Sequence, residues 1–105
     1  MNVAAQDLKN KIDSGEKVVI VDVRTPAELV RGRITGAINI PLDFFEGSIE
    51  KKVPDKNANV YLYCLSGSRS IVAAKIMEQK GYKNVFNLLS GILAWRAKNY
   101  PLALN

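Results

Sequence analysis

The sequence predicts an α/β domain with a mostly parallel central sheet and helices on both faces. Short runs of β-branched and aromatic residues alternate with helical patterns along the chain, as they do in crossover units. Residues 18–23 (VVIVDV) form a mainly β-branched run, which is typical of a strand covered on both faces. The chain has 105 residues and no internal repeat, so we expect one domain over residues 1–105.

The first third of the chain predicts a helix, a strand and a second, short helix. A weak helical pattern covers residues 3–14, with Asn2 as the expected N-cap. The strand over residues 18–23 follows. Residues 25–28 (TPAE) then combine a capping threonine, a proline at the first helical position and a glutamate three residues after the cap. This second helix is expected to be short because Gly32 interrupts it.

The middle of the chain predicts a brief strand and a third helix. Residues 34–41 read as a loop that leads into a strand ending at a proline. A short helix is expected over residues 42–52, with Phe44 and Phe45 in the core. Residues 54–57 (PDKN) are good turn formers and predict a polar loop.

The last third predicts two further strands and two helices. The strand over residues 60–63 leads directly into the only cysteine of the chain. A helix over residues 70–80 ends at the next residue, a glycine. Residues 85–89 predict a strand, and residues 92–98 predict the final helix, with Trp95 as its largest buried side chain.

Composition excludes several classes of protein. The net charge of +5 is spread along the chain without aromatic interleaving, so we expect no nucleic-acid partner. No apolar run approaches the ~20 residues that span a bilayer, and no signal-peptide pattern begins the chain, so we expect no membrane partner and a cytoplasmic protein. The absence of histidine and the single cysteine predict no metal site, no cofactor and no Cys–His catalysis. We expect a monomer, although the sequence leaves open the oligomeric state and whether an export leader was removed.

Cys64 is the candidate nucleophile. It stands at the end of a predicted strand, faces a tight polar loop, and precedes a helix. Loop N–H groups and a helix N-terminus favour negative charge, and ligands of parallel sheets bind at the carboxyl ends of strands. Because no histidine is present, thiolate formation must be assisted by these groups and by Arg69. The predicted anion-binding residues are the remainder of the loop: Leu65, Ser66, Gly67, Ser68, Arg69 and Ser70.

Each of these residues also has a plainer interpretation. A single cysteine is most often an inert, buried small hydrophobe. Arg69 contacts substrate in one interpretation and is a structural ion-pair partner in the other. Asp22 and Arg24 look structural, because a carboxylate and a guanidinium at a strand end brace neighbouring loops. The role of Arg33 is left undecided.

Four segments, which occur along the chain in the family's order, resemble the rhodanese-like family and together cover nearly the whole chain. The segments are 64–70 (CLSGSRS), 21–24 (VDVR) with Glu28, 32–41 (GRITGAINIP), and 81–85 (GYKNV) with 89–91 (LSG) and Trp95. Two positions depart from the usual pattern. Arg33 stands where many relatives have histidine, and Ser90 stands where glycine is common.

The resemblance implies a three-layer α/β/α sulfurtransferase domain. Cys64 would take a sulfane sulfur from thiosulfate or a persulfide donor, become a persulfide, and pass the sulfur to cyanide, a small thiol or a protein acceptor. Related phosphatases and arsenate reductases carry five residues between cysteine and arginine, whereas this chain has four between Cys64 and Arg69. The resemblance therefore favours sulfur transfer.

Two other functions stay open at this stage. The chain could be a non-enzymatic persulfide carrier or interaction module that another enzyme loads. A phosphatase or arsenate reductase is the weaker alternative, because of the loop length and the lack of a second cysteine. The sequence does not identify the physiological sulfur donor or acceptor.

Overall fold

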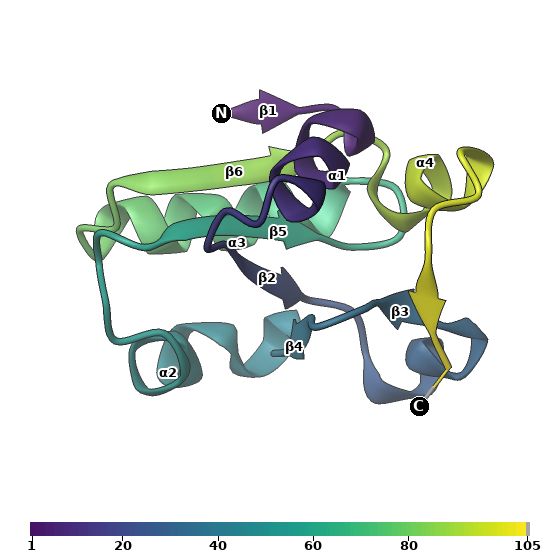
Figure 1. The fold of residues 1–105 in the computed structure, drawn as a ribbon. Helices are drawn as coiled ribbons and strands as arrows, with labels where there is room; N and C mark the ends of the chain where they lie inside the picture. The colour runs from purple at the N-terminus through teal and green to yellow at the C-terminus, as the bar shows by residue number, and fades with distance from the viewer. Residues whose placement is uncertain (105) are drawn as a thin grey trace.

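A parallel sheet of five strands forms the centre of the computed structural model, which describes residues 1–104 (Figure 1). The strand order is β1-β6-β5-β2-β4, and every neighbouring pair is parallel. The strands are β1 (Asn2–Val3), β2 (Val19–Asp22), β4 (Ile38–Asn39), β5 (Asn59–Tyr63) and β6 (Asn84–Leu88). A separate antiparallel pair consists of β3 (Arg33–Ile34) and β7 (Leu102–Ala103).

Helices cover both faces of this sheet. They are α1 (Ala5–Asp13), the 3₁₀ helix η1 (Pro26–Arg31), α2 (Leu42–Lys52), α3 (Ser68–Gln79) and α4 (Gly91–Ala97). In Figure 1, α1 lies in front of the sheet and α3 behind it. The predicted α/β class with a mostly parallel sheet is confirmed. Within residues 1–104, none of the helices is long and apolar enough to cross a membrane.

The two faces of β5 belong to different cores. Because side chains alternate along a strand, Val60 and Leu62 pack with α2 and α3, whereas Tyr61 and Tyr63 pack with α1 and α4. Cys64 continues this alternation and joins the first core. The strand therefore directs the cysteine toward α3.

The start of the chain differs from the prediction. Asn2 is not a helix cap, because it belongs to β1 and pairs with Asn87 of β6. The helix is capped at Ala4, whose N–H donates to the carboxylate of Asp7 at 2.9 Å. The sequence pattern missed β1 because a strand of two residues has no periodicity to detect. The same reason explains why β3 and β7 were not predicted.

The helix predicted over residues 42–52 is confirmed as α2, but one of its two predicted core residues is wrong. Phe45 is completely buried, whereas Phe44 is 67% exposed. Ile49 lies one turn after Phe45 and shares its inward face, while Phe44 is rotated by about 100° around the helix.

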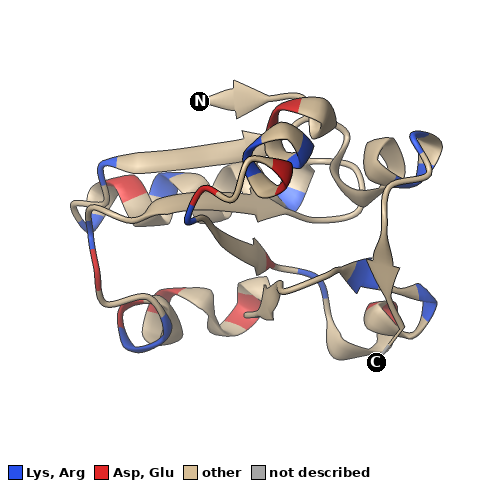
Figure 2. Ribbon diagram, in the orientation of Figure 1, with Lys and Arg blue, Asp and Glu red and all other residues tan. Residues whose placement is uncertain are grey.

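Basic residues are distributed over several elements rather than along one stripe (Figure 2). Lysines and arginines of η1, β3 and α4 lie at the end of the molecule where these three elements meet. This is also the end toward which the strands of the sheet point (Figure 1).

Candidate active site

Cys64 lies directly after β5, with its side chain under the following loop. The residue is only 1% exposed. Its Sγ accepts a hydrogen bond from the Gly67 N–H at 3.1 Å and lies 3.6 Å from the Ser70 hydroxyl. The sulfur is therefore buried beside the apolar core but contacts polar donors, unlike an inert core cysteine.

The loop curls over the sulfur because of its backbone conformation at Gly67. This residue has φ +113°, a region that favours glycine, and it is the N-cap of α3. Gly67 is buried, whereas Leu65, Ser66 and Ser68 lie on the surface. Of the three serines predicted to donate to an anion, only Ser70 lies beside the sulfur.

The surroundings of Cys64 have opposing effects on the pKa of its thiol. Burial raises the pKa of the thiol, but hydrogen bonds outweigh it: the Ser70 hydroxyl and the backbone N–H groups of Ser70, Gly67 and Arg69 hold the pKa below its ordinary value. All of these donors belong to the loop or to the first turn of α3. The site thus stabilises a thiolate without an imidazole base.

Ser70 is itself held by a buried asparagine. Its hydroxyl oxygen contacts Asn87 Oδ1 and lies 3.2 Å from the Gly67 carbonyl oxygen, so its single proton is shared between these acceptors and the sulfur. Asn87 Nδ2 donates to Asn2 Oδ1 at 3.1 Å, so the chain of contacts runs from β1 through β6 to the thiol. Sequence reasoning missed Asn87. A single polar residue inside an apolar strand was the available signal, because a buried amide needs a partner.

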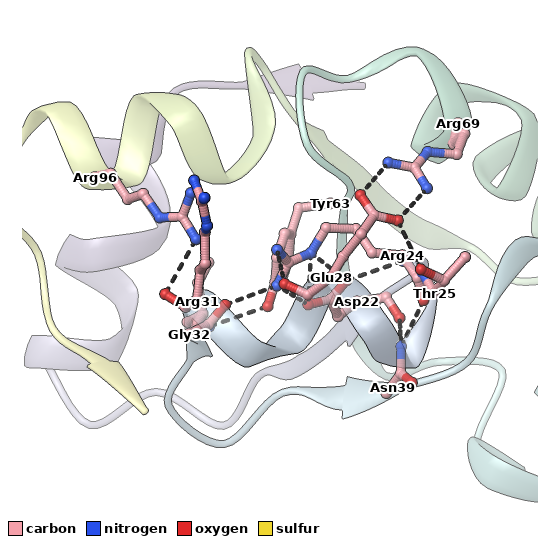
Figure 3. Close-up of polar contacts among 11 residues, drawn as sticks. Asp22, Arg24, Thr25, Glu28, Arg31, Gly32, Asn39, Tyr63, Arg69 and Arg96 are labelled. Atoms are coloured by element: carbon pink, nitrogen blue, oxygen red, sulfur yellow. Dashed lines mark hydrogen bonds and ion pairs between the residues drawn. The ribbon is translucent and has the colours of Figure 1, made fainter. Parts of the chain in front are cut away.

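Arg69 makes an ion pair with Glu28 of η1 (Figure 3). Its Nη1 and Nη2 atoms donate to the two carboxylate oxygens at 2.7 and 2.8 Å. The same carboxylate accepts the Thr25 N–H at 3.0 Å, which is the predicted capping contact. Hydrogen bonding from Arg69 lowers the pKa of Glu28 to about 2. Glu28 therefore ties the end of the active-site loop to the start of η1.

Asp22 and Arg24 form a second, fully buried pair. Arg24 Nε donates to Asp22 Oδ1 at 3.0 Å and Nη2 donates to Oδ2 at 2.7 Å. The guanidinium also donates to the carbonyl oxygens of Glu28 and Gly32, at 3.2 and 2.9 Å, and lies over the ring of Tyr63 (Figure 3). The pair therefore braces η1 against the end of β2 without reaching the sulfur.

The start of α4 closes the site from the other side. The N–H groups of Ile92 and Leu93 donate to the carbonyl oxygens of Cys64 and Leu65, at 3.0 and 3.3 Å. Gly91 makes this approach possible: a Cβ there would lie 2.6 Å from the Leu65 oxygen and closer still to the Cys64 oxygen. The sequence predicted a turn at residues 90–91 but gave no sign of this contact.

The remaining predicted residue, Arg33, lies in β3, where it is half-buried and pairs with Ala103 of β7. The contacts of Cys64 given above do not include it. Among residues 1–104, no group of three histidine, cysteine, aspartate or glutamate side chains is arranged to hold a metal ion.

Comparison with known proteins agrees with this geometry. Residues 4–98 match the model of the rhodanese-like domain family. A sulfurtransferase of Allochromatium vinosum is 35% identical over 100 residues, which cover 95% of this chain and 92% of that protein. The thiosulfate sulfurtransferase PspE of Escherichia coli is 42% identical over 67 residues, 64% of each chain. The crystal structure of a rhodanese-related protein from Thermoplasma volcanium matches with a TM-score of 0.86 at 30% identity, over 99% of this chain and 98% of that one. The chain therefore belongs to the rhodanese-like domain family, and the relatives from Allochromatium vinosum and Escherichia coli are named sulfurtransferases.

Proposed function

We propose that this protein is a sulfurtransferase that moves a sulfane sulfur from thiosulfate, through a persulfide on Cys64, to cyanide or a thiol. The observation that carries the proposal is the placement of Sγ: it is buried, receives the Gly67 N–H, lies near the Ser70 hydroxyl, and has a lowered pKa. A thiolate is the nucleophilic form of cysteine, so this placement prepares the residue for attack.

The first step loads the enzyme. The Cys64 thiolate attacks the outer sulfur of thiosulfate and forms a new S–S bond. The original S–S bond of thiosulfate breaks, and its electron pair leaves with sulfite. The product is a persulfide anion on Cys64, so charge is conserved and no proton is needed. We expect the donors that hold the thiolate to hold the outer sulfur in turn.

The second step transfers the outer sulfur from Cys64 to the acceptor. Cyanide or a thiol attacks the outer sulfur, the bond between this sulfur and Sγ breaks, and the electron pair returns to Sγ. Cyanide leaves as thiocyanate, and a thiol leaves as a persulfide that carries the thiol's proton. The Cys64 thiolate is regenerated, which gives a two-step cycle with one covalent intermediate.

The loop favours sulfur over a phosphate group. Only four residues separate Cys64 from Arg69, and the Arg69 guanidinium is engaged by Glu28 through both terminal nitrogens. A tetrahedral oxyanion needs several donors around it, whereas a single sulfur atom needs few. This supports the sulfurtransferase over the phosphatase and arsenate reductase alternatives.

Intact mass measurement tests the proposal. Incubation with thiosulfate is expected to add the mass of one sulfur atom to the protein, and cyanide is expected to remove it with release of thiocyanate. Cys64→Ser should gain no mass and show no turnover. A wild-type protein that gains nothing, or a Cys64→Ser protein that gains the same mass, would refute the proposal. Loading by thiosulfate without multiple turnovers would support the carrier alternative instead.

A further inference from the structure

A cavity of about 320 Å³ lies beside the active-site loop, between η1 and the last turn of α4. Leu65, which follows Cys64 directly, forms part of its wall. Ala27 and Val30 add further apolar surface, and Val30 is 76% exposed. A cavity of this size accommodates a small organic molecule.

The charged groups around this cavity leave an excess of positive charge. The carboxylate of Glu28 is committed to Arg69, and Arg24 is committed to Asp22. Arg31 and Arg96 also line the cavity, and neither has an ion-pair partner among residues 1–104.

Arg96 is held in place by the backbone of η1. Its Nη2 donates to the Arg31 carbonyl oxygen at 3.2 Å, and Figure 3 shows the side chain reaching from α4 to this point. A guanidinium has five N–H donors, so most of those on Arg96 stay available. Both guanidinium groups line the same cavity, so an anion bound there is attracted to two positive charges.

We propose that this cavity binds the carboxylate of a small organic thiol that accepts sulfur from Cys64. The inference rests on the proposed sulfurtransferase function and adds the chemical class of the acceptor. The unpaired arginines select an anion, and the apolar wall formed by Ala27, Val30 and Leu65 selects one with a carbon chain. Thiosulfate has no carbon chain, so the cavity fits the acceptor better than the inorganic donor.

The bound acceptor would react as described for the second step. Its sulfur forms a bond with the outer sulfur of the Cys64 persulfide, the bond to Sγ breaks, and the electron pair stays on Sγ. The thiol proton ends on the new organic persulfide. Binding of the carboxylate contributes by holding the acceptor beside the loop, which lowers its KM or raises the frequency of productive attack.

Two matched acceptors test the proposal. 3-Mercaptopropionate carries a carboxylate, whereas 2-mercaptoethanol is neutral and of similar size. The quantity to measure is the ratio of kcat/KM for 3-mercaptopropionate to kcat/KM for 2-mercaptoethanol, with thiosulfate as donor. Because loading of Cys64 is common to both reactions, it cancels in the ratio. Differences in intrinsic thiol reactivity cancel when the ratio is compared between variants.

The variants are Arg31→Gln, Arg96→Gln and the double substitution, with Lys83→Gln as the control for net charge. Lys83 is exposed and precedes β6, at the opposite end of the sheet from Cys64. Each arginine substitution is expected to lower the ratio about three- to ten-fold, the effect of losing one charge-assisted contact at a partly open site. The double substitution should lower it further, and the control should leave it at the wild-type value.

The outcomes distinguish failure of the proposed acceptor site from failure of the proposed sulfurtransferase function. If Cys64 is loaded and both thiols are used, but the ratio is the same in the arginine variants and the wild type, the acceptor site is refuted and sulfur transfer stands. If the ratio falls equally in Lys83→Gln, general charge steering explains it and the site is also refuted. If thiosulfate never loads Cys64, the proposed function itself fails.

Discussion

Gly91→Ala tests whether contact with α4 shapes the active-site loop. The added Cβ would lie 2.6 Å from the Leu65 carbonyl oxygen, whereas ordinary carbon–oxygen contacts are about 3.3 Å or longer. The Cys64 oxygen would be closer still, so the loop or the helix must move by at least roughly 0.7 Å. This movement strains the two hydrogen bonds that Ile92 and Leu93 donate to the loop. Each such bond contributes about 1 kcal/mol and overpacking costs about 1–3 kcal/mol, so we expect the contact to cost roughly 3–5 kcal/mol.

Two other glycines separate the causes of this loss. Gly15 has φ +79° with no atom within 4 Å of an added Cβ, so Gly15→Ala should cost only about 1 kcal/mol for its backbone conformation. Gly47 lies inside α2 with open space around it, so Gly47→Ala should stabilise the protein by about 0.5–1 kcal/mol. Urea denaturation of the three variants measures these values. If Gly91→Ala loses no more stability than Gly15→Ala, the contact argument is wrong.

The other predictions concern ionisation at the site. Ser70→Ala removes a donor to the sulfur, so the pKa of Cys64 should rise and the pH profile of its alkylation by iodoacetamide should move to higher pH. Ser68→Ala changes an exposed position and should leave the profile in place. Equal shifts in the two variants would contradict the role of Ser70. Glu28→Gln should cost about 1 kcal/mol at pH 7, the value of a partly exposed ion pair with Arg69. Because folding depresses the pKa of Glu28 from 4.5 to about 2, the stability difference between wild type and variant should be complete above pH 4.5 and disappear as the pH falls toward 2. Urea denaturation across this range checks it, and a difference that persists at pH 2 would count against the ion pair.

The sequence allowed the fold class to be predicted because its strands are continuous apolar runs and its helix starts carry capping signals. Residues 25–28 show this most clearly: the predicted cap at Thr25 and the return contact from Glu28 are both present. Periodicity was less informative in α2, where two adjacent phenylalanines gave no indication of which one faces the sheet. Phe44 and Phe45 differ only in their rotation around the helix axis.

The candidate site was predicted only in part, because its contacts join segments that are distant in the chain. The position of Cys64 after a strand followed from local sequence alone. The contacts of Asn87 and Gly91 did not, since they depend on how β6 and α4 pack against the loop. For Arg69 the sequence left two roles open. The ion pair with Glu28 is present, and contact with substrate stays a prediction.

The chain of contacts from Asn2 to the thiol also has a consequence for folding kinetics. Asn2 and Asn87 are 85 positions apart, and no two neighbouring strands of the central sheet are joined by a hairpin within residues 1–104. Contacts of such long range form late, after slow loop closure. The cysteine of a refolding chain should therefore keep the ordinary pKa of a free thiol until the sheet is complete. Pulse labelling with iodoacetamide at different pH values during refolding would then show when Cys64 acquires its lowered pKa, and so when the last step of assembly occurs.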